Sequence, residues 1–306
     1  MTLTMNPAVD IASSTARVRP TDKMRCAAPR FDPGGGGINV ARTIAVLGEP
    51  VTAVFPVGGP EGERLEQLVR DARVPMRTVP VANSTRQSLS VGDEATAAQY
   101  RFVFPGPRLT APEQRRCLIA VERAAVSARL VVASGSLPPG VSADFYQELA
   151  NYLADVDIPL ILDTAGAPLR AMRHGVYVLK PSVRELADLV GHPLPDRPAQ
   201  VAAARALITA GVTEIVLLSL GSAGALLVTA DRDESFAPLR ASVRSGIGAG
   251  DAMVGGLCAG ILRGYALGDA VRLGIAAATA ALGTPGTGPG HPRRIAELFG
   301  AVGSPE

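Results

Sequence analysis

The sequence predicts an α/β fold in which a parallel sheet is covered by helices on both faces. Short apolar runs rich in Val, Ile and Leu alternate with segments of helical spacing along most of the 306 residues. The runs are apolar throughout rather than at every second position, which is typical of strands buried on both faces. No unit of roughly 20–50 residues repeats, which excludes a solenoid.

The elements follow in order along the chain. The predicted strands are Val51–Val57, Leu130–Ser134, Pro159–Asp163, Val176–Leu179 and Glu214–Ser219. The predicted helices are Ile38–Leu47, Glu61–Ala72, Ala111–Ala124, Ala143–Ala154 and Ala199–Ala210. Thr110 followed by Glu113 has the spacing of a capping box, which predicts that a helix begins there.

Two regions break this alternation, residues 8–32 and residues 84–105. The first is polar and irregular. The second contains Arg86–Val91 and Gln99–Phe104, which alternate in polarity around a turn near Gly92 and so predict a hairpin with one exposed face. We expect the two regions to form a small β-sheet beside the main one, acting as a lid or an oligomer surface within a single domain of residues 1–306.

The C-terminal third has a different character. Gly250–Gly264 and Leu267–Leu282 are long, rich in Ala and Gly, and almost uncharged. This composition predicts two buried helices that pack closely against each other.

Composition excludes several classes of protein. Thirty basic residues against 28 acidic ones leave a net charge of +2, which gives no electrostatic reason to expect nucleic acid or a membrane as a partner. Three widely separated cysteines indicate neither a disulfide framework nor a zinc site. Because no signal peptide or spanning segment is visible, we expect a cytoplasmic protein. Only Lys23 and Lys180 are lysines, and neither belongs to a Walker A loop.

The strongest candidate site is the stretch from Ser245 to Met253. Glycines and other small residues lead directly into an apolar helix, so backbone N–H groups and the helix N-terminus can converge on an anion. Asp251 lies in the first turn of that helix. It is either an ordinary acid that complements the helix dipole, or a base beside an anion hole, as a phosphoryl-transfer enzyme needs.

A second candidate is the run from Asp32 to Arg42, in which four glycines precede a helix. Consecutive glycines favour either a flexible loop or close approach of the backbone to a ligand. Asn39 lies one helical turn further on, where its amide is able to bind a hydroxyl group.

Three more loops follow predicted strands, where ligands bind in a parallel sheet. They are Gly135–Gly140, Leu179–Leu186 and Ser219–Gly224. Each also has a purely structural interpretation: a stiff turn, a helix start capped by Ser182 and Glu185, and a connection between two strands. Lys180 and Glu185 in the second loop are able to bind a nucleotide phosphate and its Mg²⁺.

Together these residues resemble the PfkB (ribokinase-like) family of carbohydrate kinases. Gly248–Asp251 is similar to the second signature of that family, and Gly34–Arg42 is similar to the first. The resemblance is strongest to the branch that phosphorylates fructose 6-phosphate, and five further stretches carry it: Asn6–Asp10, Lys23–Cys26, Thr85–Gln87, Tyr100–Phe102 and Ser134–Gly140.

The resemblance implies a ribokinase-like three-layer α/β/α sandwich with a small β-sheet lid, and a homodimer formed through that lid. It implies that ATP phosphorylates fructose 6-phosphate to fructose 1,6-bisphosphate with Mg²⁺ bound, and it makes K⁺ a further candidate ion. Asp251 is then the general base, and Gly248, Ala249 and Gly250 form the anion hole.

The remaining implied roles fall into three groups. The residues implied to hold the sugar phosphate are Asp10, Lys23, Gly35, Gly36, Asn39, Arg86 and Ser136. Those implied to contact ATP are Lys180, Ser182, Ser219, Gly221 and Gly224. Glu185 is implied for Mg²⁺, and backbone carbonyls around Ser245, Ile247 and Gly286 for K⁺. Lys23 and Arg86 are the candidates for the phosphate already on the sugar, because a phosphorylated substrate needs cations that a free sugar does not.

Two departures from the family pattern leave alternatives open. The family's Asn-x-x-Glu motif reads Ser182-x-x-Glu185, and the loop Thr284–Gly288 differs from its counterpart in the fructose 6-phosphate branch. The alternatives are a 1-phosphofructokinase, a tagatose-6-phosphate kinase, or a catalytically weak protein that binds ATP and a sugar phosphate. A nicotinamide-dependent dehydrogenase is disfavoured, because no Gly-x-Gly-x-x-Gly loop follows the first strand.

Overall fold

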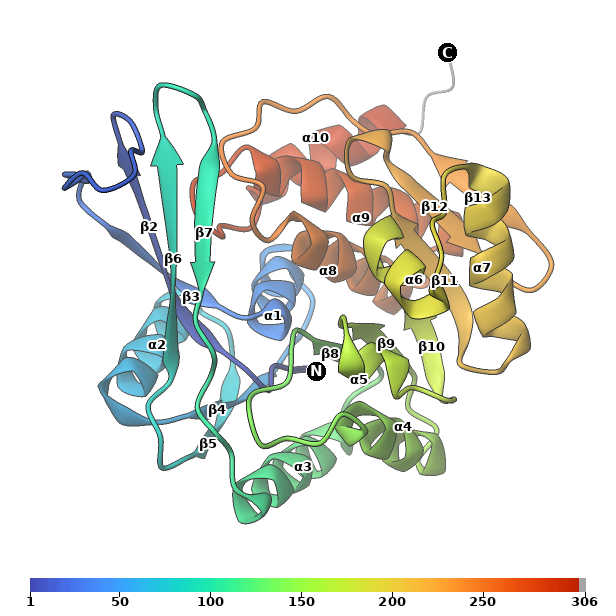
Figure 1. The fold of residues 1–306 in the computed structure, drawn as a ribbon. Helices are drawn as coiled ribbons and strands as arrows, with labels where there is room; N and C mark the ends of the chain where they lie inside the picture. The colour runs from blue at the N-terminus through green and yellow to red at the C-terminus, as the bar shows by residue number, and fades with distance from the viewer. Residues whose placement is uncertain (303–306) are drawn as a thin grey trace.

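A nine-stranded sheet forms the centre of the molecule, in a computed structural model that describes residues 1–302 (Figure 1). In order across the sheet, the strands are β13 (Asp233–Phe236), β12 (Ala225–Val228), β11 (Thr213–Ser219), β10 (Val176–Leu179), β9 (Leu160–Asp163), β8 (Val131–Ser134), β1 (Thr2–Leu3), β4 (Ala53–Val57) and β5 (Met76–Pro80). All five predicted strands are confirmed. From β11 to β5 every pair of neighbours is parallel.

The prediction that the main sheet is parallel is wrong at one of its edges. β11 and β12 pair antiparallel, as do β12 and β13. The cause is the short connection after Ser219, in which Gly221 and Gly224 take positive φ values of 60° and 94°. A parallel pair needs a crossover of a dozen or more residues, which this turn does not provide.

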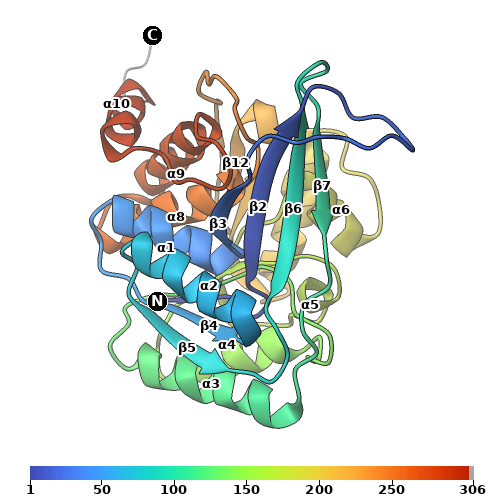
Figure 2. The same cartoon turned by 90° about the vertical axis from the view of Figure 1, so that its left-hand side faces the viewer.

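Helices cover both faces of the sheet, giving three layers (Figures 1 and 2). One face carries α1 (Gly36–Val46), α2 (Gly59–Asp71), α8 (Ala249–Leu262) and α9 (Leu267–Leu282), with α10 (Pro292–Val302) packed outside α9. The other carries α3 (Ala111–Ala125), α4 (Phe145–Asp155), α5 (Ala167–Arg170), α6 (Val183–Val190) and α7 (Arg197–Thr209). The side chains of β4 show why both faces need cover: Ala53 and Phe55 enter one core, and Val54 enters the other.

The five predicted helices are confirmed, and local contacts explain where one of them, α3, begins. The Glu113 carboxylate accepts hydrogen bonds from the N–H and the hydroxyl of Thr110, so α3 begins where the capping box predicts. Close packing explains the composition of α8 and α9. A Cβ on Gly256 would lie 2.6 Å from the Leu273 carbonyl oxygen, and one on Gly260 would lie 2.6 Å from Ala270 Cα.

A second sheet of four strands stands beside the main body (Figure 2). Its order is β3 (Arg30–Gly34), β2 (Ala8–Thr15), β6 (Arg86–Asp93) and β7 (Gln99–Val103). β2 and β6 pair in parallel although more than seventy residues separate them, and the predicted hairpin forms the antiparallel pair of β6 and β7. We call this sheet the lid sheet. Among residues 1–302, no helix has the length and apolar character that crossing a membrane requires.

Candidate active site

The carboxyl ends of β8, β9, β10 and β11 meet the start of α8 at one edge of the main sheet, and the lid sheet stands across from them (Figure 1). Parallel strands leave their ligand crevice at this edge, because the loops that follow them diverge there. The loops singled out from the sequence after these strands therefore come together in space.

The start of α8 presents free backbone N–H groups. Gly248 takes a left-handed conformation, with φ 81°, which turns the chain into the helix. The first intrahelical bond runs from the Ala252 N–H to the Gly248 carbonyl, so the amides of Ala249, Gly250 and Asp251 have no intrahelical acceptor. These amides and the helix dipole together favour an anion at this point.

Asp251 projects from the first turn of α8 and is partly buried. Its Oδ2 atom accepts a hydrogen bond of 2.9 Å from the Nδ2 atom of Asn39. Burial, together with the nearby Asp163 carboxylate, raises the pKa of Asp251 to about 7. A carboxyl group with a pKa near the working pH is suited to accept a proton in one step and release it in the next.

The glycine run at the start of α1 places Asn39 beside this carboxylate. Gly35 takes a positive φ of 112°, and a Cβ on it would lie 2.6 Å from Thr4 Cγ2. A Cβ on Gly36 would collide with the Ser134 hydroxyl, and one on Gly37 with the Leu3 carbonyl. The run is therefore not a flexible linker: its glycines let the backbone pass tightly against the ends of β1 and β8.

An ion pair between the buried Lys180 and the partly buried Asp163 lies close to Asp251. The Nζ atom of Lys180 is 3.1 Å from the Oδ1 atom of Asp163. Burial lowers the pKa of Lys180, but the carboxylates of Asp163 and Glu185 raise it more strongly, so Lys180 remains an ammonium ion. A Cβ on Gly250 would lie only 3.7 Å from this Nζ atom, which places the cation next to the free amides of α8.

Two cavities meet at Gly250. The first has a volume of about 430 Å³ and is lined by carboxylates, arginines and hydroxyls, including Asp10, Arg86, Arg101, Asp163 and Asp251. The second has a volume of about 650 Å³ and is mostly apolar, with Ser219, Gly221, Gly224, Pro238, Met253 and Leu282 in its wall. The acid and the free amides thus lie between a polar chamber and an apolar one, as transfer of a group between two ligands requires.

Residues 3–294 match the model of the pfkB family of carbohydrate kinases. The chain belongs to this family. Over 287 residues it is 55% identical to the ATP-dependent 6-phosphofructokinase isozyme 2 of Mycobacterium tuberculosis, covering 94% of this chain and 85% of that one. It is 40% identical to the Escherichia coli isozyme 2 over 291 residues, covering 94% and 93%. The crystal structure of Escherichia coli phosphofructokinase-2 in complex with fructose-6-phosphate superposes with a TM-score of 0.90, at 36% identity, covering 99% of this chain and 98% of that one.

The lid sheet of this PfkB kinase contributes three charged side chains to the polar cavity. Burial raises the pKa of Asp10 to about 6, while Arg101 and Arg86 act to lower it. Arg86 donates to the backbone carbonyls of Asn6 and Phe104, so its guanidinium is largely engaged. Arg101 makes no hydrogen bond to another side chain within residues 1–302, which leaves its charge available to a ligand.

Sequence reasoning did not select Arg101, although the signal was present. In a strand, alternate residues share a face, so Arg101 and Val103 point one way and Tyr100 and Phe102 the other. Arg101 and Val103 line the polar cavity of the kinase. By contrast, Lys23 lies on the exposed loop between β2 and β3 and does not line either cavity.

The other residues predicted for the sugar phosphate line the polar cavity. Besides Asp10, Asn39 and Arg86, they are Gly35, Gly36 and Ser136. Of those predicted for ATP, Ser219, Gly221 and Gly224 line the apolar cavity. Ser136 accepts a hydrogen bond of 3.0 Å from Asn6, which fixes the loop after β8.

Ser182 and Glu185 form the capping box of α6 in this kinase. The Ser182 hydroxyl accepts from the Glu185 N–H at 3.3 Å, and the Glu185 Oε2 atom accepts from the Ser182 N–H at 2.8 Å. The structural interpretation of this pair thus holds. Glu185 also lines the polar cavity close to Asp163, so its second carboxylate oxygen remains free to face a ligand.

The loops predicted for K⁺ lie side by side. A Cβ on Gly248 would lie 3.8 Å from Thr287 Cα, which joins the loop that begins at Ser245 to the loop of Gly286. The Ser245 hydroxyl accepts from the Ile247 N–H at 3.2 Å and so shapes the first loop. Backbone carbonyls are suitable ligands for a hard cation, and no group of three or more His, Cys, Asp and Glu within residues 1–302 is able to hold a transition metal.

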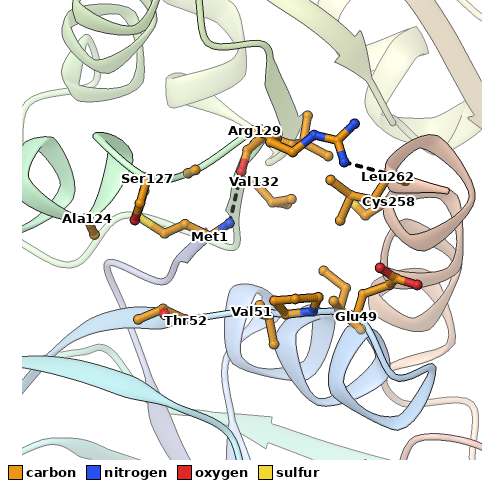
Figure 3. A pocket seen from close by; sticks show the side chains of 14 residues that line it. Met1, Glu49, Val51, Thr52, Ala124, Ser127, Arg129, Val132, Cys258 and Leu262 are labelled. Carbon is orange, nitrogen blue, oxygen red and sulfur yellow. Dashed lines mark hydrogen bonds between the residues drawn. The ribbon is translucent and has the colours of Figure 1, made fainter. Parts of the chain in front are cut away.

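A third cavity, of about 330 Å³, lies at the opposite edge of the main sheet (Figure 3). Met1, Val51, Thr52 and Leu130, which precede β1, β4 and β8, form its floor. Burial raises the pKa of Cys258 to about 12, so this thiol is not a nucleophile at neutral pH. None of the residues predicted for catalysis or binding lines this cavity.

Proposed function

We propose that this kinase transfers the γ-phosphoryl group of ATP to fructose 6-phosphate, forming fructose 1,6-bisphosphate. One observation carries the proposal: Asp251 and the free amides of α8 lie where a polar cavity containing Arg101 meets an apolar cavity able to hold a nucleoside. The two 6-phosphofructokinase relatives, at 55% and 40% identity, support fructose 6-phosphate as the acceptor.

The protein aligns the two substrates, stabilises the charge that develops during the transfer, and provides one general base. Asp251 accepts the proton of the sugar's primary hydroxyl as the oxygen attacks the γ-phosphorus, and the amides of Ala249, Gly250 and Asp251 stabilise the charge that develops on the transferred group. Asn39 donates to one oxygen of the Asp251 carboxylate, so the other is the oxygen available to the hydroxyl.

The remaining side chains hold the two ligands. Arg101 and Arg86 bind the phosphate already present on the sugar, Asp10 and Ser136 bind its hydroxyls, and Lys180 lies beside the phosphates of the nucleotide. Lys23 stays a candidate for the same sugar phosphate, because its loop belongs to the lid sheet.

Two ions complete the proposed site. Glu185 is the residue proposed to hold Mg²⁺, which is usually bound through one or two carboxylates together with the phosphates of a substrate. Carbonyls of the loops at Ser245, Ile247 and Gly286 are proposed to hold K⁺, and a structure of the Escherichia coli protein in complex with potassium supports that assignment.

The assembly proposed is a homodimer formed through the lid sheet. Tyr100 and Phe102 on β7, and Phe104 directly after it, are exposed large apolar side chains, and Met24 is exposed on the loop between β2 and β3. Exposed aromatic side chains gathered on one sheet are typical of a protein interface. Escherichia coli phosphofructokinase-2 has a tetrameric inhibited form, which supports assembly of several copies of the chain in this family.

The decisive experiment measures ADP release with three acceptors: fructose 6-phosphate, fructose 1-phosphate and tagatose 6-phosphate. We expect the largest kcat/KM with fructose 6-phosphate. The Asp251→Asn variant, assayed in parallel, reports any ATP hydrolysis that does not depend on the base.

A preference for fructose 1-phosphate would instead assign the chain to the 1-phosphofructokinases, among which one relative is 34% identical. Tight binding of ATP in a calorimeter, without turnover of any of the three sugars, would overturn the enzymatic proposal and favour a binding protein.

A further inference from the structure

A buried guanidinium lies behind the proposed base. Arg42 projects from α1 and is 7% exposed. Its NH1 atom donates to Asn39 Oδ1 at 3.2 Å, to the Thr287 carbonyl at 2.8 Å and to the Thr287 hydroxyl at 3.1 Å, with a weaker contact of 3.4 Å to the Pro33 carbonyl. Its NH2 atom is 4.0 Å from Asp32 Oδ1. One side chain thus joins the lid sheet, α1 and the loop of Thr287.

The contact with Asn39 has a chemical consequence for the base. A guanidinium has donors and no acceptor, so the atom of Asn39 that faces it must be the carbonyl oxygen. The amide group is planar, and its NH2 end is therefore turned toward Asp251, to which it donates at 2.9 Å. Without this constraint the amide is able to turn over and present its oxygen to the carboxyl group.

We propose that Arg42 is a positioning residue for Asp251, holding the Asn39 amide in the orientation that donates to the carboxylate. The proposal rests on the proposed function only in naming Asp251 as the base. Orientation matters because an amide N–H favours the ionised carboxylate, which is able to accept a proton, whereas an amide oxygen favours the protonated acid.

Several other charges act on Asp251 and must be separated from this effect. Asp163 on β9 and Asp10 on β2 raise its pKa, and Lys180, which follows β10, lowers it. Arg42 itself is a positive charge near Asp251, so its removal acts both through the charge and through the amide. A test must therefore vary the charge and the amide independently.

The experiment follows the titration of the Asp251 carboxyl group by carbon-13 NMR, assigned by comparison with Asp251→Asn. Arg42→Met removes the donor and the charge, and we expect it to raise the pKa by about 1 to 2 units, the range that a charge-assisted hydrogen bond gives. Arg42→Lys keeps a donor-only cation and is expected to titrate close to the wild type. Both variants lose the contacts with Thr287, so a merely structural role affects them alike.

A double-mutant cycle isolates the amide. In an Asn39→Ala background, Arg42→Met is expected to shift the pKa much less than it does in the wild type, because the group through which it acts is gone. Equal shifts in the two backgrounds would show that Arg42 acts only by its charge, and would overturn the proposal. The titration needs no substrate, so it gives an answer even if the enzyme prefers another sugar.

Two further variants serve as control and as replacement, Thr287→Val and Arg42→Leu. Thr287→Val removes a hydroxyl that Arg42 contacts but keeps Asn39, and should leave the titration unchanged. If Arg42→Met fails to fold, Arg42→Leu takes its place, because it also removes every donor that faces Asn39 Oδ1. An unshifted pKa in Arg42→Leu would overturn the proposal. With a sugar phosphate that is turned over, the acid limb of kcat/KM should move with the pKa while the KM for ATP stays constant.

Discussion

Asp251 is partly buried, which raises its pKa, and it accepts one hydrogen bond from Asn39, which lowers it; the resulting pKa is about 7. We predict that Asp251→Asn folds normally and lowers kcat by ~10²–10⁴, the usual contribution of general base catalysis. In the wild type, kcat/KM should fall as the pH drops below about 7, because protonated Asp251 cannot accept a proton. Initial rates of the wild type and of Asp251→Asn across pH 5.5–9, with the preferred sugar, measure the loss of kcat and the pH dependence of kcat/KM. Near-normal turnover by the variant would remove Asp251 from the mechanism.

The same residue carries a cost in stability. Its pKa in the folded protein, about 7, lies above the ordinary 3.8, so the folded state binds this proton more tightly than the unfolded chain does. The stability gained from protonation is present below pH 4 and is lost as the pH rises through 7. At pH 8 Asp251→Asn should therefore raise the free energy of unfolding, by at most ~4 kcal/mol. Urea denaturation at pH 8 and pH 5 checks the sign, and a gain at pH 5 as large as that at pH 8 would contradict it.

Arg101 makes a prediction about the sugar phosphate. We expect Arg101→Met to raise its KM by ~10–100-fold, because a charge-assisted bond to a phosphate is lost, with little change in the KM for ATP. Lys23→Ala is the matched comparison from the exposed loop of the same sheet, and it too should raise the sugar-phosphate KM more than the ATP KM. Steady-state kinetics with each substrate varied in turn measures the change in the KM for the sugar phosphate and the change in the KM for ATP. For either variant, equal changes in the two KM values would exclude that residue from the phosphate site.

Among the elements, α8 and α9 depend most on individual glycines. A Cβ on Gly256 would lie 2.6 Å from the Leu273 carbonyl and 2.7 Å from Gly274 Cα, so it would meet backbone that cannot move aside cheaply. Gly256→Ala should therefore destabilise the protein by ~1–3 kcal/mol. Gly300→Ala in α10 is the control, because no atom lies within 4 Å of its added Cβ, and it should be neutral or more stable by up to ~1 kcal/mol. Thermal unfolding of the two variants compares them, and equal Tm values would contradict the packing argument.

The elements that sequence reasoning found and missed differ in length and in context. β10 is found with its observed bounds, because an apolar run between His174-Gly175 and Lys180-Pro181 leaves little choice. β1 was missed because it has only two residues, and its place in the centre of the sheet comes from pairing with β4 and β8. β12 and β13 were missed because each has only four residues, and a sequence this short does not show whether a strand is present or which way it runs. The antiparallel pairing at this edge follows from the tight turn between β11 and β12.

At the scale of the whole molecule, the lid sheet joins segments far apart in the sequence and leaves aromatic side chains on its surface. Phe102 is 51% exposed on the face opposite Arg101, and we predict that Phe102→Asp prevents the proposed dimer from forming and leaves a monomer. Val126→Asp is the control, because Val126 is 84% exposed but lies at the end of α3. Analytical ultracentrifugation measures the oligomeric state of both variants and of the wild type. A dimer that persists in Phe102→Asp would move the interface away from this face of the lid sheet.

The candidate site was predictable where it is built from strand ends and glycine loops. Asp251, Asn39 and Ser136 come together because parallel strands deliver their loops to one edge. Arg42 and Asp163 were not predictable as site residues, since a helix arginine and a strand-end aspartate are ordinary in sequence. Their roles depend on burial next to Asn39 and Lys180, which only the packed structure reveals.

The close contact of α8 with α9 also bears on how substrates come and go. α8 is tied to α9 and to α1 through backbone contacts at Gly256, Gly260 and Gly255, whereas the edge strand β7 of the lid sheet is exposed along its whole length. Regions with few buried contacts open locally, and densely packed ones open only when the whole protein unfolds. In a single subunit, β7 is therefore the part of the site expected to open locally, while the helix that carries Asp251 stays closed; a dimer formed through the lid sheet would cover β7 and restrict this opening.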